Sequence, residues 1–349
     1  MNHSEDDLPP TTVVIPTLNE AEYIGITISQ IMSEAPACLL EIIVADGGST
    51  DGTQEIVSQI ARNDPRVRMI HNPRRIQSAG INAAVREADP RAKIIVRVDA
   101  HSGYDRSFVC NVVSEMVRLQ VDSIVVRLRT AGLSCFQKAV AAVSNSLSGT
   151  GGSNHRMGRN SGFVEHGHHA GIRVERFLAL GGYDESFVAN EDAEFDYRLC
   201  RAGGRIWLAA DIVIQYYPRA TPHALARQYF RYGWGRAQNV LKHRQRLRLR
   251  QMLPPLLVAY LLVMPFALAF LPNLLATLTL VPFVIYTILI AVSTFTAYRQ
   301  NRSYCIMVAA LVLPIMHCAW GLGFLLKLIL NNAARFMNQK IRTSRAGSA

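Results

Sequence analysis

Carboxylates follow short apolar segments of the chain, at the point where each segment ends. Asp46 closes the run Glu41–Ala45 and is followed by two glycines, and Asp99 closes the run Ile94–Val98. Short runs rich in β-branched residues that end in a turn are typical of buried strands. In open α/β sheets, ligands bind outside the carboxyl ends of the strands. Asp46 and Asp99 are therefore expected where a nucleotide can be bound.

The triplet Asp99-Ala100-His101 combines a carboxylate with an imidazole two positions later. On an extended strand, residues i and i+2 point to the same side, so both groups can hold one divalent cation. Mg²⁺ and Mn²⁺ favour oxygen-rich sites, and the imidazole favours Mn²⁺. The alternative is a strand-end acid beside a surface histidine.

A second acidic triplet, Asn190-Glu191-Asp192, precedes a helix predicted over Asp192–Ala202. Asp192 can be the N-cap of this helix, because an aspartate oxygen accepts from the first free backbone N–H groups. It can instead be a general base that takes the proton of an attacking hydroxyl in a closed site. Both interpretations remain open at this point.

Strands and helices alternate over the first hundred residues. After a loose tail at residues 1–11, we expect strands at Thr12–Pro16, Glu41–Ala45, Val67–Ile70 and Ile94–Val98, separated by helices at about Ala21–Ser33, Gln54–Arg62 and Ser78–Ala88. This alternation predicts an α/β domain, over residues 12–222, with a mostly parallel central sheet. Its second part is less regular, with a helix at Phe108–Leu119, a strand at Ser123–Arg129, a flexible loop at Ser144–Ser161, and strands at Arg205–Leu208 and Val213–Tyr217.

Charge and hydropathy divide the chain near Asp211. All 26 acidic residues lie at or before Asp211, with 21 basic residues, whereas the remainder has 16 basic residues and no acid. The basic part contains three apolar runs, Leu253–Leu271, Leu274–Ala297 and Cys305–Leu330. Each run is long enough to cross a bilayer as a helix of about 20 residues. Because apolar runs interleave the charges, a membrane is favoured as partner over nucleic acid.

We therefore expect a basic amphipathic interfacial segment at residues 223–252, a membrane region at 253–330 with about three transmembrane helices, and a basic tail at 331–349. The basic residues just before the first run favour a cytoplasmic start. Three crossings would then place the basic tail outside, so either the rule fails at the tail or one run is re-entrant. Residues 1–10 have no basic or apolar leader pattern, so no cleaved signal peptide is expected.

Six cysteines are present, and none forms a C-x-x-C pair or shows zinc-site spacing. They are Cys38, Cys110, Cys135, Cys200, Cys305 and Cys318. We expect free thiols in a reducing compartment.

Four motifs together resemble family 2 glycosyltransferases, which have the GT-A fold. They are Pro-Thr-Leu-Asn-Glu at 16–20, Ala-Asp-Gly-Gly-Ser-Thr-Asp-Gly-Thr at 45–53, Val-Asp-Ala-His at 98–101 and Asn-Glu-Asp at 190–192, and the match covers about residues 12–211. The segments His166–Gly171 and Gly181–Glu185 are similar to the bacterial exopolysaccharide branch of the family.

The resemblance implies roles for individual residues. The nucleotide pocket would be lined by Pro16, Asn19 and Glu20, with Asp46 at the uracil or its ribose and Asp99 at the ribose and metal. His101 stands where the family's D-x-D motif has its second, metal-binding acid, so this sequence departs from the pattern there. Asp192 would be the base, with Glu191 beside it. Arg74 or Arg75 would neutralise the diphosphate, or the two would be a solvated surface pair.

Other residues fit an acceptor or membrane interface. Gln228, Arg231 and Trp234 resemble the Q-x-x-R-W motif of processive synthases, but two extra residues separate the arginine from the tryptophan. An amphipathic helix in the headgroup layer explains the same aromatic and basic residues equally well. For His166, His168 and His169 we expect packing near the acceptor site rather than a metal cluster.

Together these patterns predict an inverting, single-addition glycosyltransferase on the cytoplasmic face of the inner membrane. The resemblance implies a UDP-sugar donor, with UDP-glucose first, a polyprenyl-diphosphate-linked sugar as acceptor, a Mn²⁺ or Mg²⁺ ion, and other exopolysaccharide assembly enzymes as partners. The alternatives are a processive polysaccharide synthase, separated by product length, and an idle membrane scaffold that keeps only the nucleotide fold.

Overall fold

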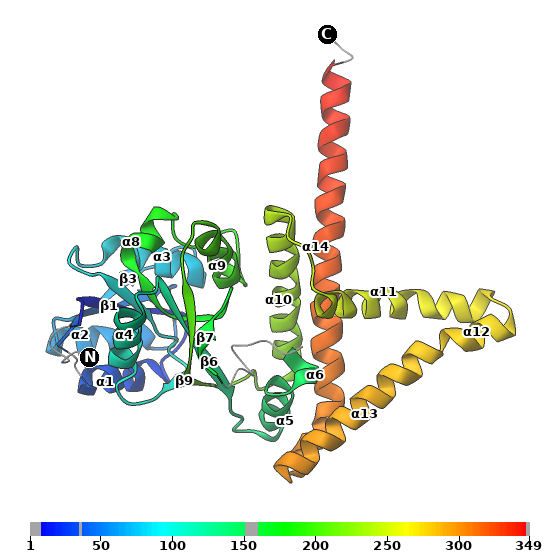
Figure 1. The fold of residues 1–349 in the computed structure, drawn as a ribbon, viewed down its shortest axis with the longest axis horizontal. Coiled ribbons are helices and arrows are strands. Elements are labelled where there is room, and N and C mark those ends of the chain that lie inside the picture. The colour runs from blue at the N-terminus through cyan, green and yellow to red at the C-terminus, as the bar shows by residue number, and fades with distance from the viewer. Residues whose placement is uncertain (1–7, 35–36, 151–159, 347–349) are drawn as a thin grey trace. The chain divides into compact units, whose positions relative to one another are not determined.

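The computed structural model describes residues 8–34, 37–150 and 160–346, and it consists of two compact units (Figure 1). The first unit comprises residues 1–131 and 152–217, and the second comprises 132–151 and 218–349. Residues 132–151 thus group with the C-terminal part, whereas the expected α/β domain was continuous. Of the expected loose tail, residues 1–7 lie outside the described residues, but Leu8 is already buried. Residues 151–159 of the expected loop also lie outside them.

A mixed sheet forms the centre of the first unit. Its strands are β1 (Thr11–Thr17), β2 (Leu39–Asp46), β3 (Val67–His71), β4 (Ile94–Arg97), β5 (Ser102–Tyr104), β6 (Ser123–Thr130), β7 (Gly162–Phe163), β8 (His168–Arg173) and β9 (Ile206–Tyr216). The order is β3-β2-β1-β4-β8-β6-β9-β5, with β7 beside β9. The four strands predicted from the first hundred residues pair in parallel, which places the ends of β1, β2 and β4 at one edge. β8 enters antiparallel between β4 and β6.

Helices cover both faces of this sheet (Figure 1). One core cluster joins the sheet to α1 (Ile24–Glu34), α2 (Thr53–Asn63) and α4 (Phe108–Leu119). The other joins the opposite face to α3 (Gln77–Glu87), α8 (Val174–Ala179) and α9 (Glu191–Arg201). Successive side chains of a strand point to opposite faces, so Val13 and Ile15 belong to the first cluster and Val14 to the second. The predicted α/β fold is confirmed.

The sheet differs from the sequence-based expectation in two ways, because β5, β7 and β8 were not predicted and two predicted strands form one. β8 was not predicted, because its sequence His-His-Ala-Gly-Ile-Arg has few β-branched residues. The two strands expected at Arg205–Leu208 and Val213–Tyr217 are one strand, β9. Val126 of β6 pairs with Ala209, but the next residue, Arg127, pairs with Val213. The residues between Ala209 and Val213 therefore form a bulge, which interrupts the strand pattern in the sequence.

The second unit is helical. Its elements are α5 (Cys135–Ser144), α6 (Leu147–Thr150), α10 (Pro222–His243), α11 (Leu249–Phe270), α12 (Asn273–Thr279), α13 (Val281–Asn301), the 3₁₀ helix η2 (Tyr304–Val308) and α14 (Ala309–Ala346). Within the described residues, three segments are long and apolar enough to cross a membrane, namely Leu249–Phe270, Asn273–Asn301 and Tyr304–Ala333. The three apolar runs seen in the sequence therefore form helices of sufficient length.

Helix α10 packs closely on α14 through glycines. A Cβ on Gly233 would lie 1.9 Å from the backbone oxygen of Trp320, and one on Gly323 would lie 2.1 Å from that of Phe230. Glycine is required at both positions, because any side chain would push the two helices apart. One face of the segment expected to lie in the headgroup layer is thus buried against another helix of the same unit.

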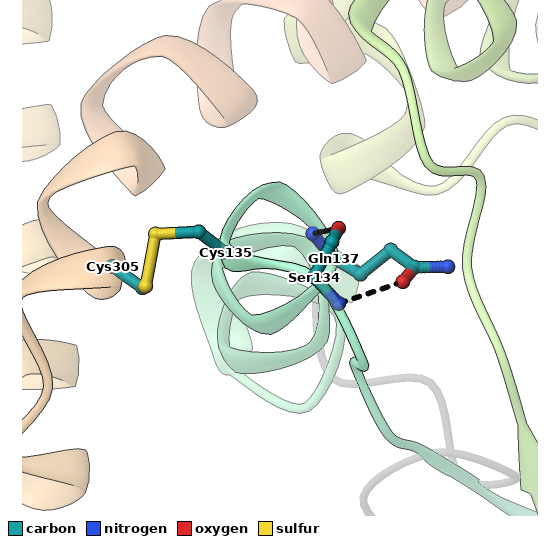
Figure 2. The surroundings of a disulfide bond; sticks show 4 residues. All are labelled: Ser134, Cys135, Gln137 and Cys305. Atoms are coloured by element: carbon teal, nitrogen blue, oxygen red, sulfur yellow. Dashed lines mark hydrogen bonds between the residues drawn. A yellow bond between two sulfur atoms is a disulfide. The ribbon is translucent and has the colours of Figure 1, made fainter.

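A disulfide joins Cys135, at the start of α5, to Cys305 in η2 (Figure 2). Ser134 caps α5, and the side chain of Gln137 accepts from the Ser134 backbone N–H in return. The expectation of six free thiols is therefore wrong for this pair. The two cysteines are 170 positions apart, so only tertiary structure brings their Cα atoms to 4.9 Å.

We expect Cys135→Ser to lower the free energy of unfolding by about 2–4 kcal/mol, because the bond closes a long loop in the unfolded chain. Denaturant unfolding of oxidised protein in detergent measures the effect. Cys318→Ser, which removes a cysteine that is free in the structure, is the control. Equal stability of Cys135→Ser and the parent protein under oxidising conditions would contradict the prediction.

Candidate active site

The loops that follow β1 and β2 hold each other in place. Asn19, with a φ of 59°, donates its backbone N–H to Ser49 Oγ at 2.8 Å and accepts from the Thr50 backbone N–H at 2.9 Å. Asp51 accepts from the Ala21 backbone N–H, and Thr53 Oγ1 accepts from that of Glu20. Asn19 and Glu20, two of the residues predicted to line the nucleotide pocket, thus lie in a loop of fixed shape beside Pro16, the third.

Asp46 lies at the end of β2 and is 2% exposed. Its carboxylate accepts from the Gly48 and Ser49 backbone N–H groups, from Ser49 Oγ and from Gln54 Nε2, at 2.5–3.0 Å. Burial alone would raise the pKa of Asp46, but these hydrogen bonds outweigh it and lower the pKa. Thr17 Oγ1 donates a further, longer bond at 3.4 Å, so protein donors occupy the lone pairs of this carboxylate and Asp46 holds the loop in place in this structure.

Asp99 lies just beyond β4 and is ionised. Its Oδ1 accepts from Gln77 Nε2 at 2.8 Å and stands 3.4 Å from Arg97 Nε. Burial opposes the charged form, but Arg97 and the nearby histidines prevail and lower the pKa of Asp99 to about 2. A permanently charged carboxylate at this sheet edge can bind a cation or accept from a ribose hydroxyl.

The structure corrects the expected relation between Asp99 and His101. β4 ends at Arg97, so the two residues lie in a turn and the strand alternation does not apply to them. His101 Nδ1 instead bonds to Glu20 Oε1 at 2.8 Å. This bond joins a predicted metal ligand to a predicted pocket residue in the loop after β1.

A second histidine, His168, contacts Asp99. Its Nε2 lies 3.6 Å from Asp99 Oδ2, and its side chain is 16% exposed. Burial and the charge of Arg97 lower the pKa of His168 to about 4, so the imidazole is neutral at pH 7. The sequence suggested His168 only as an acceptor-site residue, because its proximity to Asp99 requires β8 to pair with β4.

Glu191 and Asp192 are the first two residues of α9, so the predicted helix begins one residue earlier than expected and includes Glu191. The N-cap is Asn190, with a φ of 63°, so the N-cap interpretation of Asp192 is wrong. Burial and the neighbouring Asp192 raise the pKa of Glu191 to about 7. Burial would also raise the pKa of Asp192, but the histidines at 169, 166 and 168 together with Arg97 lower it. Two adjacent carboxylates thus differ in their protonation at neutral pH.

Arg97 links these groups and was not predicted as a site residue. It is 7% exposed, and its guanidinium lies 3.4 Å from Asp99 and 3.8 Å from Glu191. Its Nη1 has no hydrogen-bond partner among the described residues. The sequence gives no sign that Arg97 belongs to the site, because it follows Ile94, Ile95 and Val96 in a run that predicts only a buried strand.

Buried hydrogen bonds hold the backbone on both sides of His168 in place. His169 Nε2 bonds to Asp196 Oδ1 at 2.6 Å, and its Nδ1 bonds to the Tyr183 hydroxyl at 2.5 Å. Asp196 Oδ2 also accepts from the Gly167 backbone N–H at 3.1 Å. Burial opposes the charge, but Asp196 outweighs it and raises the pKa of His169. These contacts fix the backbone on both sides of His168.

Of the predicted diphosphate arginines, Arg74 is engaged by a carboxylate. Its Nη1 lies 2.7 Å from Glu185 Oε2, and Glu185 also accepts from Asn82. The preceding turn needs glycine at Gly182, which has a φ of 70° and whose Cβ would lie 2.5 Å from Asn82 Oδ1. Arg75 is exposed, with a φ of 56°, at the start of the α3 segment.

The remaining predicted residues divide between the two units. His166 is exposed in the first unit, before β8. Gln228, Arg231 and Trp234 lie on α10 in the second unit. Gln228 bonds to the Tyr232 hydroxyl, Arg231 is exposed, and Lys327 Nζ lies 5.0 Å from the Trp234 ring centroid.

Asp99 and His101 have the chemistry of ligands for a divalent cation. No group of three or more histidine, cysteine and acidic residues that could hold a metal occurs among the described residues. Asp99 nevertheless supplies a charged oxygen. The Glu20 bond to His101 Nδ1 favours the tautomer with an electron pair on Nε2, as in carboxylate–histidine–metal arrangements.

Models of known families match the chain in two places. Glycosyl transferase family 2 matches residues 12–180, and Glycosyl transferase family group 2 matches residues 136–320. The succinoglycan biosynthesis protein ExoA of Rhizobium meliloti (strain 1021) is 44% identical over 324 residues, which are 92% of this chain and 96% of the relative.

Two more distant proteins are similar over most of the chain. A dolichyl N-acetyl-α-D-glucosaminyl phosphate glycuronosyltransferase of Methanococcus voltae is 23% identical over 92% of this chain and 98% of its own. Among solved structures, the mannosyltransferase PcManGT from Pyrobaculum calidifontis, in complex with GDP-Man and Mn²⁺, superposes with a TM-score of 0.60 at 18% identity, covering 92% of this chain and 88% of that chain. This last similarity supports the predicted GT-A fold.

Proposed function

The chain belongs to glycosyl transferase family 2, and from this premise we propose that it adds one sugar from a UDP-sugar to a polyprenyl-diphosphate-linked acceptor in exopolysaccharide biosynthesis. The 44% identical relative over nearly the full length is named as a succinoglycan biosynthesis protein, which supports the pathway class. UDP-glucose is the first candidate for the donor. The observation that carries the proposal is the buried group of Arg97, Asp99, His168, Glu191 and Asp192 at the end of β4.

Asp192 is the general base in this proposal. Its lowered pKa keeps it ionised at neutral pH, so it can accept the proton of the acceptor hydroxyl. The oxygen then attacks the anomeric carbon from the face opposite the nucleotide, and the configuration inverts. The neighbouring Glu191 has a pKa of about 7 and is therefore only partly ionised at neutral pH, which limits repulsion between the two carboxylates.

The nucleotide side of the site is assigned to the loops after β1, β2 and β3. Pro16, Asn19 and Glu20 line the nucleotide, Asp46 holds the loop that faces the uracil or ribose, and Arg75 approaches the diphosphate. Asp99 with His101 would hold a Mn²⁺ or Mg²⁺ ion, which when bound offsets the charge of the leaving diphosphate. Positive groups held close to the leaving diphosphate lower the activation barrier of sugar transfer, because they stabilise the negative charge that develops there.

The three candidate membrane spans support a reaction at the surface of a bilayer. Three segments of sufficient length follow the catalytic unit, and we propose that this unit lies on the cytoplasmic side of the inner membrane. Exopolysaccharide assembly enzymes are proposed partners. His166 and His168 of the first unit are assigned to the acceptor side. Gln228, Arg231 and Trp234 of the second unit are assigned to the acceptor or to the membrane interface.

The assay that tests this function uses membranes containing the full chain, extracted lipid acceptor, a panel of labelled UDP-sugars, and Mn²⁺, Mg²⁺ or a chelator. We expect a single-sugar increment on a lipid with one donor, at least about tenfold weaker in chelator because the leaving diphosphate loses its counter-charge. His101→Ala should raise the metal concentration needed for half-maximal transfer, whereas Asp105→Ala, which removes an exposed acid nearby in sequence, should not.

Product length separates the alternatives. A ladder of products would favour a processive synthase, the reading that Gln228, Arg231 and Trp234 suggest. Absence of incorporation with native-host lipids, despite measurable UDP binding, would favour a scaffold that keeps only the nucleotide fold.

A further inference from the structure

The second unit contains basic side chains without any acidic ones. It carries Lys138 and the 16 basic residues beyond Asp211, whereas all 26 aspartates and glutamates belong to the first unit. A buried arginine in this unit therefore has no carboxylate of its own unit as a counter-ion. Buried charges in proteins are normally paired or bound to a ligand. An arginine that is largely buried here thus points to an anion from outside the unit.

Arg236 is such a residue. It lies on α10 near the start of α11, and its Nη2 donates to Gln251 Oε1 at 3.2 Å. Its Nε is buried and has no hydrogen-bond partner among the described residues. Burial and the nearby positive charges of Arg248 and Arg250 lower the pKa of Arg236. Three guanidinium groups thus approach one another at the beginning of a candidate membrane span, Leu249–Phe270.

One turn further along α10, Asn239 is completely buried. Neither its Nδ2 nor its Oδ1 has a hydrogen-bond partner among the described residues. Residues three apart on a helix lie on the same face, so Asn239 is a neighbour of Arg236. A buried amide with both polar atoms unmatched is rare, because it forfeits its hydrogen bonds to water.

An unmatched amide also occurs on α14. The helices α10 and α14 run in the same direction (Figure 1), and Lys327 of α14 lies over the Trp234 ring of α10. Asn331 follows Lys327 by one turn of α14, and Asn239 follows Trp234 by little more than one turn of α10. Asn331 Nδ2 is also buried and lacks a partner among the described residues. Unmatched polar atoms from two helices thus occur near the same end of the helix pair.

Phosphate is the anion that these groups suit. Guanidinium groups bind phosphate oxygens by paired, charge-assisted hydrogen bonds, and amide Nδ2 groups can donate to the remaining oxygens. The cluster adjoins the start of one candidate span, and Asn331 lies near the end of another, Tyr304–Ala333. Basic clusters in such positions bind the head groups of lipids.

We propose that Arg236, Asn239 and Asn331, with Arg248 and Arg250, form a binding site for the phosphate group of a lipid. The site requires no nucleotide sugar and no catalysis, so it holds whether or not the proposed transfer reaction is correct. A polyprenyl diphosphate and a phospholipid head group offer the same chemistry, and the experiment separates them.

The test uses full-length protein in detergent and follows its thermal unfolding midpoint as ligand is added, because a ligand that binds only the folded state raises it. The probes are farnesyl diphosphate, dioleoylphosphatidylglycerol and inorganic diphosphate. We expect one of the two lipids to raise the midpoint in a saturable manner, and that lipid identifies the source. If inorganic diphosphate raised the midpoint as much as that lipid does, the assignment of the site to a lipid would be overturned.

The variants are Arg236→Gln, Arg236→Lys and Asn239→Leu. Arg236→Gln should weaken lipid binding at least about tenfold, and Arg236→Lys should lie between it and the parent because the planar fork is lost while the charge remains. Arg227→Gln removes an exposed arginine of the same helix that bonds to His223, and it should bind as the parent does.

Asn239→Leu separates a role in lipid binding from a role in stability alone. Without lipid, its midpoint should rise above that of the parent, because an unmatched buried amide is replaced by an apolar group of similar size. With lipid, its affinity should fall. A lower midpoint with unchanged affinity, or Arg236 variants that bind like Arg227→Gln, would overturn the proposal.

Discussion

Replacing Asp192 by asparagine should lower the rate of sugar transfer by about 10²–10⁴-fold, the usual contribution of a general base. Asparagine keeps the shape of the side chain but cannot accept the proton of the acceptor hydroxyl. Because the proposed nucleotide contacts come from the loops after β1 and β2 and from Asp99, the affinity for UDP should change little. Initial rates with labelled donor and UDP titration by calorimetry measure the two effects separately.

The same variant should change the titration of its neighbour. The charge of Asp192 is one cause of the raised pKa of Glu191, after burial. Asp192→Asn should therefore lower the pKa of Glu191 from about 7 towards the ordinary range, as NMR of labelled glutamate would show. This readout reports on the carboxylate pair even where transfer is too slow to measure.

Two comparisons make the assignment specific. Glu191→Gln should reduce transfer less than Asp192→Asn, since Glu191 is partly protonated at neutral pH and cannot be the main base. Asp211→Asn, at an exposed position in the irregular part of β9, should have no effect. Turnover of Asp192→Asn at the parent rate would remove Asp192 from the proposed mechanism.

The second large effect concerns stability rather than rate. Asp196→Ala should lower the free energy of unfolding of the first unit by about 3–5 kcal/mol, because it removes one partner of a buried ionic contact and leaves the other unmatched. Asp196 and His169 are both 0% exposed, and the Gly167 backbone N–H would lose its acceptor as well. Denaturant unfolding, followed by a signal from the first unit, measures the loss.

The pH dependence of this loss has a defined sign. The folded-state pKa of His169 is raised above its value in the unfolded chain, about 6.5. The contribution of charged His169 to stability is therefore complete below pH ~6.5 and is lost as the pH rises through the folded-state pKa. The difference between the parent and Asp196→Ala should be larger at pH 6 than at pH 9.

Glu115→Ala is the matched control. Glu115 forms an ion pair with Arg118 one turn later on α4, with the arginine side chain 58% exposed. Exposed pairs of this kind contribute at most about 1 kcal/mol. A cost for Asp196→Ala no larger than that of Glu115→Ala would show that the buried contact is not important for stability.

The sequence by itself determined the first four strands, their helices and the three apolar runs. Those features depend on local periodicity and on the length of apolar segments, which a single chain displays directly. The strand-end motifs also indicated that Asp46 and Asp99 lie where β2 and β4 end, because the carboxyl ends of parallel strands meet at one edge. The acidic triplet at 190–192 indicated the start of α9.

Tertiary structure decided which of these residues meet. Arg97 looks like one more residue of a buried strand, yet it joins Asp99 to Glu191, and His168 reaches Asp99 only because β8 pairs with β4. His101 bonds to Glu20, 81 positions away, and Cys135 bonds to Cys305 across 170. Contacts between distant residues leave no periodic trace in sequence, since they depend on strand order and helix packing rather than on spacing along the chain.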